Sequence, residues 1–321
     1  MPPHFYTDNP GIYSNERQTM SKNPRFTILE GRGLLAVAGP DRVDFLQGLV
    51  SNDMKMVGTD RAVYAALLTP QGKYLYDFFV FELDGALILD CERAGLEGLK
   101  KRLSLYKLRA DITLEDRSGD LAVAAVFGEG ALAALGLSDQ SGAALAFSGG
   151  IACTDPRLAD VGGRCVLPGE KAETALTAAG FSPTEPGEYD HLRLRLGLPD
   201  GSRDLISDKS ILLESGFEEL NGVDWDKGCF MGQELTARTK YRGLIKKRLM
   251  PVTFNGPPPE SGTPVMAGDK NAGEARSSLA TEDGGIGLAL LRLEALENST
   301  DLTAGGVSIT ANRPDWMAVE E

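Results

Sequence analysis

The sequence contains very little cysteine and histidine, the residues from which most zinc and iron–sulfur sites are built. Its cysteines and histidines are Cys91, Cys153, Cys165, Cys229, His4 and His191. No two cysteines form a C-x-x-C pair, a spacing typical of zinc sites and of clusters held by one chain. We therefore expect no metal ion bound by this chain alone.

Long apolar runs and an excess of positive charge are also lacking. No run approaches the roughly 20 residues of a membrane span, and the polar residues 1–24 contain no apolar segment of the kind found in signal peptides. The formal net charge of −13 argues against direct binding to nucleic acid or to an acidic membrane. Cysteines without a secretion signal favour a reducing compartment, and we expect the cytoplasm.

The 321 residues exceed what one ordinary hydrophobic core supports, so we expect more than one domain. Residues 1–24 show no hydrophobic periodicity and are predicted to be a disordered leader; Met20 is a candidate start of translation, and the alternative is a leader packed on the surface. Residues 25–245 mix strand-like and helix-like segments, which predicts an α+β body. Residues 246–321 are rich in proline and glycine between strand-sized runs, a pattern typical of a small β-barrel.

The most unusual stretch of the sequence is the glycine-flanked cysteine in Asp226–Gly243. Two glycines bracket Cys229, Lys227 precedes it, and helix-forming residues follow. Such a turn brings a thiol to the start of a helix, where the helix dipole and the lysine favour the thiolate. The alternative is a buried, inert cysteine in a tight turn.

The segment after this cysteine carries a basic cluster. On a helix, Glu234, Arg238 and Arg242 share one face because they are four residues apart. The basic residues from 238 to 248, with no acidic residue among them, are Arg238, Lys240, Arg242, Lys246, Lys247 and Arg248. This cluster suits a carboxylate or phosphate ligand, and the alternative is a solvated face beside a hinge strand.

Asp77 is a second candidate for chemistry. It lies in a predicted strand after the Gly72 turn, where a catalytic carboxylate could face a cleft or, as the alternative, solvent. A G-x-G pattern at Gly31 and Gly33 lacks the phosphate-binding spacing and is a weak signal. The sequence contains no P-loop, no G-x-S-x-G and no H-E-x-x-H motif.

The cysteine motif resembles the K-G-C-[YF]-x-G-Q-E…A-R…R-G signature of the YgfZ family. Its residues are Lys227-Gly228-Cys229-Phe230-Met231-Gly232-Gln233-Glu234, then Ala237-Arg238 and Tyr241-Arg242-Gly243. Similarity also covers Thr69-Pro70-Gln71-Gly72-Lys73, Leu105-Tyr106-Lys107-Leu108-Arg109 and Arg195-Leu196-Gly197-Leu198-Pro199. Members of this family are folate-dependent proteins of iron–sulfur cluster biogenesis, related to the glycine-cleavage T-protein, an aminomethyltransferase.

The resemblance implies an α+β fold of the T-protein type. Antiparallel sheets with helices would form three subdomains around a central channel, with two interleaved subdomains over 25–245 and a C-terminal β-barrel over 246–321. Relatives bind tetrahydrofolate or a derivative in that channel.

The resemblance also implies roles for individual residues. Cys229 would be the functional thiol with Lys227 beside it, and Asp77 aligns with the acidic stretch that holds the catalytic aspartate of the T-protein. The residues implied to shape the folate site are Tyr189, Gln233, Glu234, Arg238, Tyr241 and Arg242. Arg32 stands where another pterin-contacting aromatic residue is expected, which is a departure from the family pattern.

The function implied is a folate-binding accessory factor for the assembly or repair of iron–sulfur clusters in client enzymes, including, in relatives, a tRNA-thiolating enzyme. Its partners would be those clients and cluster-assembly proteins, and we expect a monomer. A tetrahydrofolate-dependent aminomethyltransferase of the T-protein type is the alternative, and a binding adaptor without turnover is another. Whether the chain is an enzyme is therefore left open.

Overall fold

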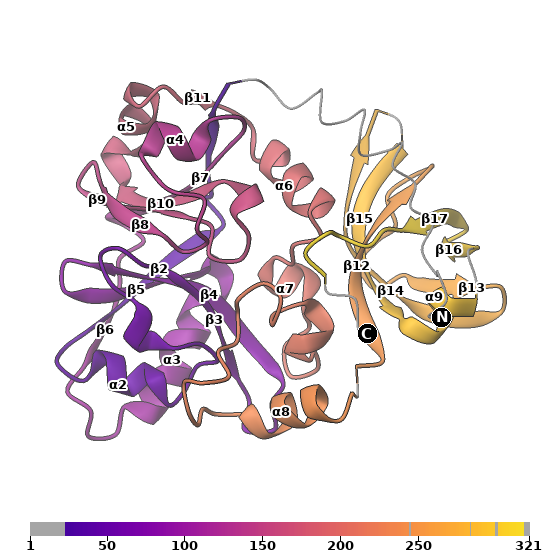
Figure 1. Ribbon diagram of the computed structural model, residues 1–321, viewed down its shortest axis with the longest axis horizontal. Coiled ribbons are helices and arrows are strands. Elements are labelled where there is room, and N and C mark those ends of the chain that lie inside the picture. Colours follow the sequence, from indigo (N-terminus) through magenta and orange to yellow (C-terminus); the bar gives the residue numbers. More distant parts are fainter. Residues whose placement is uncertain (1–22, 244, 283, 299–300, 318–321) are drawn as a thin grey trace.

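The computed structural model describes residues 23–243, 245–282, 284–298 and 301–317. Two β-sheets lie face to face with helices on their outer sides, and a separate barrel stands beside them (Figure 1). The expected leader lies outside the described residues, apart from its last two positions. Within the described parts, no helix combines the length and apolar character needed to cross a membrane.

The two sheets are interleaved along the chain, since β1 joins the first sheet, β2 to β6 form the second, and β7 to β11 return to the first. In spatial order the first sheet is β11 (Ser182–Pro183), β1 (Arg25–Ile28), β7 (Leu121–Phe127), β10 (Gly163–Pro168), β9 (Gly150–Thr154) and β8 (Ala144–Phe147). The second is β3 (Val63–Leu68), β4 (Tyr74–Leu83), β5 (Ala86–Glu92), β2 (Arg32–Ala38) and β6 (Thr113–Asp116).

Strand periodicity explains how both faces of these sheets become buried. Successive side chains of a strand point to opposite faces. In β4, Phe79 and Phe81 therefore join the core between the sheets, whereas Phe78 and Val80 join the core beneath the helices. A third core lies on the outer face of the first sheet. Strands buried on both faces read as continuous apolar runs, as these do.

Helices cover the outer faces and connect the sheets to the barrel. The α-helices before the barrel are α2 (Arg42–Gln47), α3 (Leu96–Lys107), α4 (Ala131–Leu135), α5 (Ala172–Ala178), α6 (Pro186–Arg195), α7 (Gly201–Asp204) and α8 (Gln233–Tyr241). The 3₁₀ turns are η1 (Met54–Met56), η2 (Arg93–Gly95), η3 (Ala159–Val161), η4 (Gly169–Lys171) and η5 (Leu212–Ser215). In Figure 1, α6 and α7 lie between the sheets and the barrel.

The C-terminal part is a closed barrel with its own apolar core. Its strands in spatial order are β12 (Lys247–Phe254), β15 (Gly284–Arg292), β14 (Lys270–Thr281), β13 (Pro264–Ala267), β16 (Leu302–Ala304) and β17 (Val307–Ala311). One short helix, α9 (Leu293–Asn298), follows β15. The outer face of the barrel packs Leu249 and Leu288 against Leu194 of α6, so this helix ties the barrel to the sheets.

Candidate functional site

Charged residues gather at one edge of the core between the two sheets. They stand two positions from core residues on the same strand and therefore share the inward face; for example, Asp77 precedes Phe79, and Asp90 follows Ile88. The charged members of these inward rows are Arg32 on β2, Asp77 on β4, Asp90 and Glu92 on β5, and Arg164 on β10. These charged side chains make one end of the otherwise apolar core between the sheets polar.

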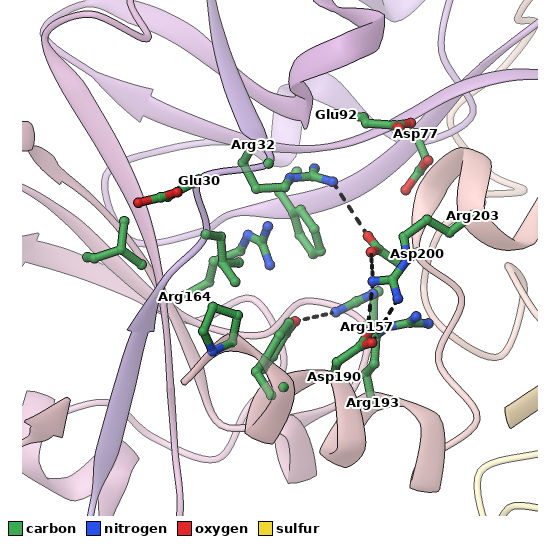
Figure 2. Close-up of a pocket in the computed structure, with 17 residues that line it drawn as sticks. Glu30, Arg32, Asp77, Glu92, Arg157, Arg164, Asp190, Arg193, Asp200 and Arg203 are labelled. Atoms are coloured by element: carbon green, nitrogen blue, oxygen red, sulfur yellow. Dashed lines mark hydrogen bonds and ion pairs between the residues drawn. The ribbon is translucent and has the colours of Figure 1, made fainter. Parts of the chain in front are cut away.

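A pocket of about 390 Å³ lies at this edge, closed on its other side by α6 and the chain around α7. Its charged lining residues are Glu30, Arg32, Asp77, Glu92, Arg157, Arg164, Asp190, Arg193, Asp200 and Arg203 (Figure 2). Phe79 and Tyr189 are the aromatic residues of the lining. The volume is in the range of small-molecule sites.

Asp90 anchors the sheet side of the pocket. Its side chain is fully buried, and it accepts hydrogen bonds from Arg32 Nε at 2.6 Å and from Arg164 Nε. Both guanidiniums and that of Arg157 also lie over the Phe79 ring, 4.0–5.8 Å from its centroid. A single aromatic ring thus carries three cations, an arrangement stabilised by the quadrupole of the ring.

The helix side of the pocket is held by a second set of ion pairs. Arg193 of α6 is buried and contacts Asp190 at 2.5 Å and Asp204 at 2.8 Å. Arg203 lies between Asp190 and Asp200, at 2.7 and 3.1 Å (Figure 2). Arg193 Nη2 is buried and has no hydrogen-bond partner among the described residues, so it is a donor with capacity for a ligand.

Two carboxylates in this pocket have pKa values moved in opposite directions. Asp77 is buried and accepts hydrogen bonds from the hydroxyls of Tyr64 (2.9 Å) and Tyr74 (2.7 Å); burial raises its pKa although Arg32 and both hydroxyls oppose the shift. Burial also acts to raise the pKa of Asp200, but the guanidiniums around it, Arg193 first, bring that pKa to about 2. Opposed shifts of this kind mark acid and base candidates.

The structure brings together only some of the residues that the sequence singled out. Three of them line the pocket: Asp77, Tyr189 and Arg32, the residue that stands where the family pattern has an aromatic side chain. The Tyr189 hydroxyl accepts a hydrogen bond from Arg157 at 3.2 Å, and its ring packs near Phe127. The residues of the cysteine motif are not among those that line this pocket.

Cys229 lies in a separate loop, between residue 223 and α8, and is the exposed one of the four cysteines. The loop is fixed at both ends. Asp224 Oδ1 accepts from the backbone N–H groups of Asp226 and Lys227, and Met231 N–H donates to Gly48 O at 3.1 Å. The thiol is therefore presented at the surface by a backbone held at both ends, and the alternative that Cys229 is buried is wrong.

Lys227 fixes the loop to the segment that follows α2. Its ammonium donates to Gln47 O at 2.8 Å and to Val50 O at 2.5 Å, and Gln47 Nε2 donates back to Lys227 O at 3.2 Å. The charge is thus directed at backbone carbonyls. The contacts give Lys227 a positioning role for the loop.

Lys227 is expected to titrate near neutral pH. Burial lowers its pKa from 10.5 to about 8, against the attraction of Asp53 and Asp224. Between about pH 8 and 10.5 the unfolded chain then binds more protons than the folded one, so this residue makes stability rise with pH. A ¹³Cε NMR titration should show a midpoint near 8, and Lys227→Met should remove this part of the pH dependence of unfolding. A midpoint at 10.5 would contradict the buried contacts.

Two glycines bring the cysteine motif against the Thr69–Gly72 turn. Gly72 and Gly232 have φ of +77° and +81°, and a Cβ on Gly232 would lie 2.5 Å from Thr69 O and 2.9 Å from the Gly72 Cα. Only glycine tolerates both the left-handed conformation and this backbone approach. Two sequence motifs far apart in the chain therefore form one structural unit.

The expected ligand residues on α8 have partners within the chain or face solvent. Gln233 Oε1 accepts from Phe230 N–H at 3.2 Å, and Glu234 pairs with Arg238 at 2.9 Å on the exposed surface. Tyr241 is exposed and its ring lies 6.2 Å from that of Trp225; Arg242 is exposed as well. They form a surface around the cysteine loop rather than a lining of the pocket.

Sequence inspection missed most of the pocket. The charged and aromatic lining residues that the sequence did not single out are Glu30, Phe79, Glu92, Arg157, Arg164, Asp190, Arg193, Asp200 and Arg203. Asp90, which pairs with Arg32 and Arg164 behind the lining, was not singled out either. On the strands, the sequence does contain a signal for such residues. A charged residue two positions from an inward apolar residue faces the core, and a buried charge needs a partner. No such signal exists for Arg157, which is held by Asp155 at 2.9 Å in a loop.

Comparison with known proteins identifies the family of this chain. Residues 246–319 match the family profile described as CAF17, C-terminal beta-barrel domain. The human and mouse proteins named "Iron-sulfur cluster assembly factor IBA57, mitochondrial" are 36% and 35% identical, each over 90% of this chain and 84% of the relative. The chain belongs to the IBA57 family of iron–sulfur cluster assembly factors. The sequence predicted a member of the YgfZ family, and the comparisons make this assignment more specific because the relatives are named IBA57.

A solved structure supports the fold assignment of this IBA57-family chain. The glycine cleavage system aminomethyltransferase T from Bartonella henselae superposes with a TM-score of 0.74 at 15% identity, covering 94% of this chain and 89% of the other. The predicted α+β fold of the T-protein type with a C-terminal barrel is confirmed.

The predicted cytoplasmic location is wrong. The human and mouse relatives, and the Aspergillus fumigatus homologue at 30% identity, are all named as mitochondrial, and these names overturn the expectation. Free cysteines indicate a reducing compartment, and that property does not distinguish one reducing compartment from another.

Proposed function

We propose that this chain is a folate-binding factor for the assembly or repair of iron–sulfur clusters, with Cys229 as its functional thiol. The single observation that carries the proposal is the exposed Cys229 on a loop fixed at both ends, in a chain whose relatives are named as iron–sulfur cluster assembly factors. An exposed thiol held in place can form a bond to iron, to sulfur or to a client protein.

Cys229 alone supports only a transient or shared bond. Among the described residues, no group of three or more His, Cys, Asp or Glu side chains could hold a metal ion. A cluster that contacts Cys229 would therefore take its other ligands from a second molecule, because iron–sulfur clusters need several such ligands. The proposed partners are cluster-assembly proteins and client enzymes, a tRNA-thiolating enzyme among them.

The pocket fits tetrahydrofolate or a derivative by the chemistry of its lining. Phe79 and Tyr189 offer aromatic surface to a pterin ring, and the carboxylates of Asp77, Glu92 and Asp200 can accept its N–H groups. The unpartnered Arg193 Nη2 suits a carboxylate of the glutamate tail. When bound, the folate would supply one-carbon or reducing chemistry.

Tetrahydrofolate binding is expected to depend on Asp77. Asp77→Asn keeps the shape of the side chain but removes a carboxylate from the pocket. We expect the affinity measured by calorimetry to fall about tenfold, because hydrogen bonds to charged groups contribute about 1.5–3 kcal/mol. Cys229→Ala, which lies outside the pocket lining, should bind as the wild type does. Absence of saturable binding by the wild type would contradict the folate proposal.

A tetrahydrofolate-dependent aminomethyltransferase is the second candidate function. The buried Asp77 with its raised pKa favours it, since enzymes commonly raise the pKa of a proton-transferring carboxyl group by burial. This candidate expects methylene-tetrahydrofolate to form from an aminomethyl donor, with the reaction abolished in Asp77→Asn. If Cys229→Ala still forms methylene-tetrahydrofolate, the aminomethyltransferase activity is independent of the thiol and is distinct from the thiol-dependent function.

The function is tested by complementation of a strain that lacks its IBA57-family member. The wild-type chain should restore the activity of cluster-dependent enzymes, assayed directly and compared with an enzyme that needs no cluster. Failure of a folded, expressed wild-type chain to restore any of them would contradict the assembly role.

A further inference from the structure

The C-terminal end of α3 exposes apolar side chains that nothing in the described chain covers. Four large apolar side chains are exposed among the described residues, and two of them lie here: Leu105 at 64% and Leu108 at 88%. The opposite face of α3 buries Leu99 and Leu103 against the second sheet. An exposed apolar pair at one helix end marks an interaction site more often than a single exposed leucine does.

The backbone at Leu108 is strained in a way that favours the same conclusion. Leu108 has φ of +44° and ψ of −103°, and Ala110 N–H donates to Lys107 O at 2.7 Å across it. This is the geometry of a type II′ turn, in which glycine is the usual residue at that position. A leucine there costs about 1–3 kcal/mol. The Leu108 side chain is almost fully exposed, so no burial within the chain offsets the cost of this strained backbone.

Positive charge surrounds the two leucines. The basic residues between positions 98 and 110, with no acidic residue among them, are Lys100, Lys101, Arg102, Lys107 and Arg109. Within the described residues, Lys101, Lys107 and Arg109 form no ion pair. In a chain with a net charge of −13, this local excess attracts an acidic partner and steers its approach.

We propose that Lys101, Leu105, Lys107, Leu108 and Arg109 form a docking surface for an acidic protein that carries apolar side chains at the centre of its contact. An apolar centre with a charged rim is the usual anatomy of a protein interface. An anionic membrane fits less well, because Asp111 is exposed three residues from Leu108 and the whole chain is acidic. The identity of the partner as a cluster-assembly or client protein rests on the proposed function; the surface itself does not.

Hydrogen bonds connect this surface to the cysteine loop through α2. At one end of α2, Asp41 Oδ2 accepts from Asp111 N–H at 2.7 Å. At the other end, Gly48 O accepts from Met231 N–H, two residues after Cys229. The six residues of α2 span about 9 Å. The chain next to this surface and the cysteine loop are therefore held at opposite ends of the same short helix.

The test places a photo-crosslinking amino acid at Leu105 and, as the matched control, at the exposed Ile206 in living cells. We expect an acidic protein to crosslink at 105 and not at 206. That protein, identified by mass spectrometry and purified, is then titrated against the full chain at low and high salt. Leu108→Asp should weaken binding about tenfold or more, Arg109→Glu should reduce the salt dependence, and Ile206→Asp should change neither.

A second variant separates docking from folding. Leu108→Gly removes the side chain and the strain together. It should therefore raise the thermal unfolding midpoint and still weaken binding of the partner. Crosslinking at 105 to lipid or to a second copy of the chain would overturn the proposal, as would unchanged binding in Leu108→Asp. Cys229→Ala should bind the identified partner through this surface and yet fail in complementation, so loss of the thiol function and loss of docking are distinguishable.

Discussion

Replacing Cys229 with alanine is expected to reduce cluster-dependent enzyme activity in the complemented strain to the level of the strain without any family member. The thiol is the one exposed cysteine of the four, and alanine removes the only thiol of the loop, a soft ligand for iron. The variant should fold normally, because the described contacts that hold the loop are made by Asp224, Lys227 and the Met231 backbone and not by the Cys229 side chain. The measurement compares client activities at equal protein levels.

Asp226→Ala is the matched control for this experiment. Asp226 is exposed in the same loop, and its one hydrogen bond among the described residues is from its backbone N–H to Asp224 Oδ1 at 2.7 Å. We expect full complementation by this variant. Cys229→Ser distinguishes the remaining alternatives, since a binding adaptor tolerates serine whereas a bond to iron or sulfur requires the thiolate. Full activity of Cys229→Ala would refute the thiol proposal.

Replacing Asp90 with alanine is expected to destabilise the chain by about 3–5 kcal/mol, the loss typical of breaking a buried ion pair. Asp90 is fully buried and is shared by Arg164, which is buried, and by Arg32, whose side chain is 8% exposed. Its loss leaves Arg164 beside Phe79 without its carboxylate and leaves Arg32, among the described residues, with only the 3.8 Å ion pair to Asp200. Urea unfolding measures the change, and tetrahydrofolate binding should weaken with it because both arginines line the pocket.

Asp120→Ala provides the comparison for Asp90→Ala. Asp120 pairs with Arg117 at 3.0 Å, but its side chain is 68% exposed. An exposed pair contributes little, so we expect a change within about 0.5 kcal/mol. Equal losses in the two variants would mean that the buried network does not stabilise the pocket edge.

Several elements of the site could be predicted from local sequence. Alternation in β4 puts Asp77 on the same face as Phe79, and the glycines around Cys229 predict a turn before a helix. The paired charges of α8 also follow from spacing, since Glu234 and Arg238 are one turn apart and form the expected ion pair. The direction of Lys227 could not be predicted, because its acceptors, Gln47 and Val50, are about 180 residues away in the chain.

The sequence by itself determined the fold class and the C-terminal barrel, and it singled out Cys229 and Asp77 as candidates, because these depend on periodicity, composition and continuous motifs. The tertiary structure decided that the thiol and the pocket are separate places. It also decided that Asp200 and Arg193 line the pocket and that Asp90 holds two of the lining arginines. The reason is physical: a buried charge is defined by its partner, and here the partners come from different sheets and helices that only folding brings together.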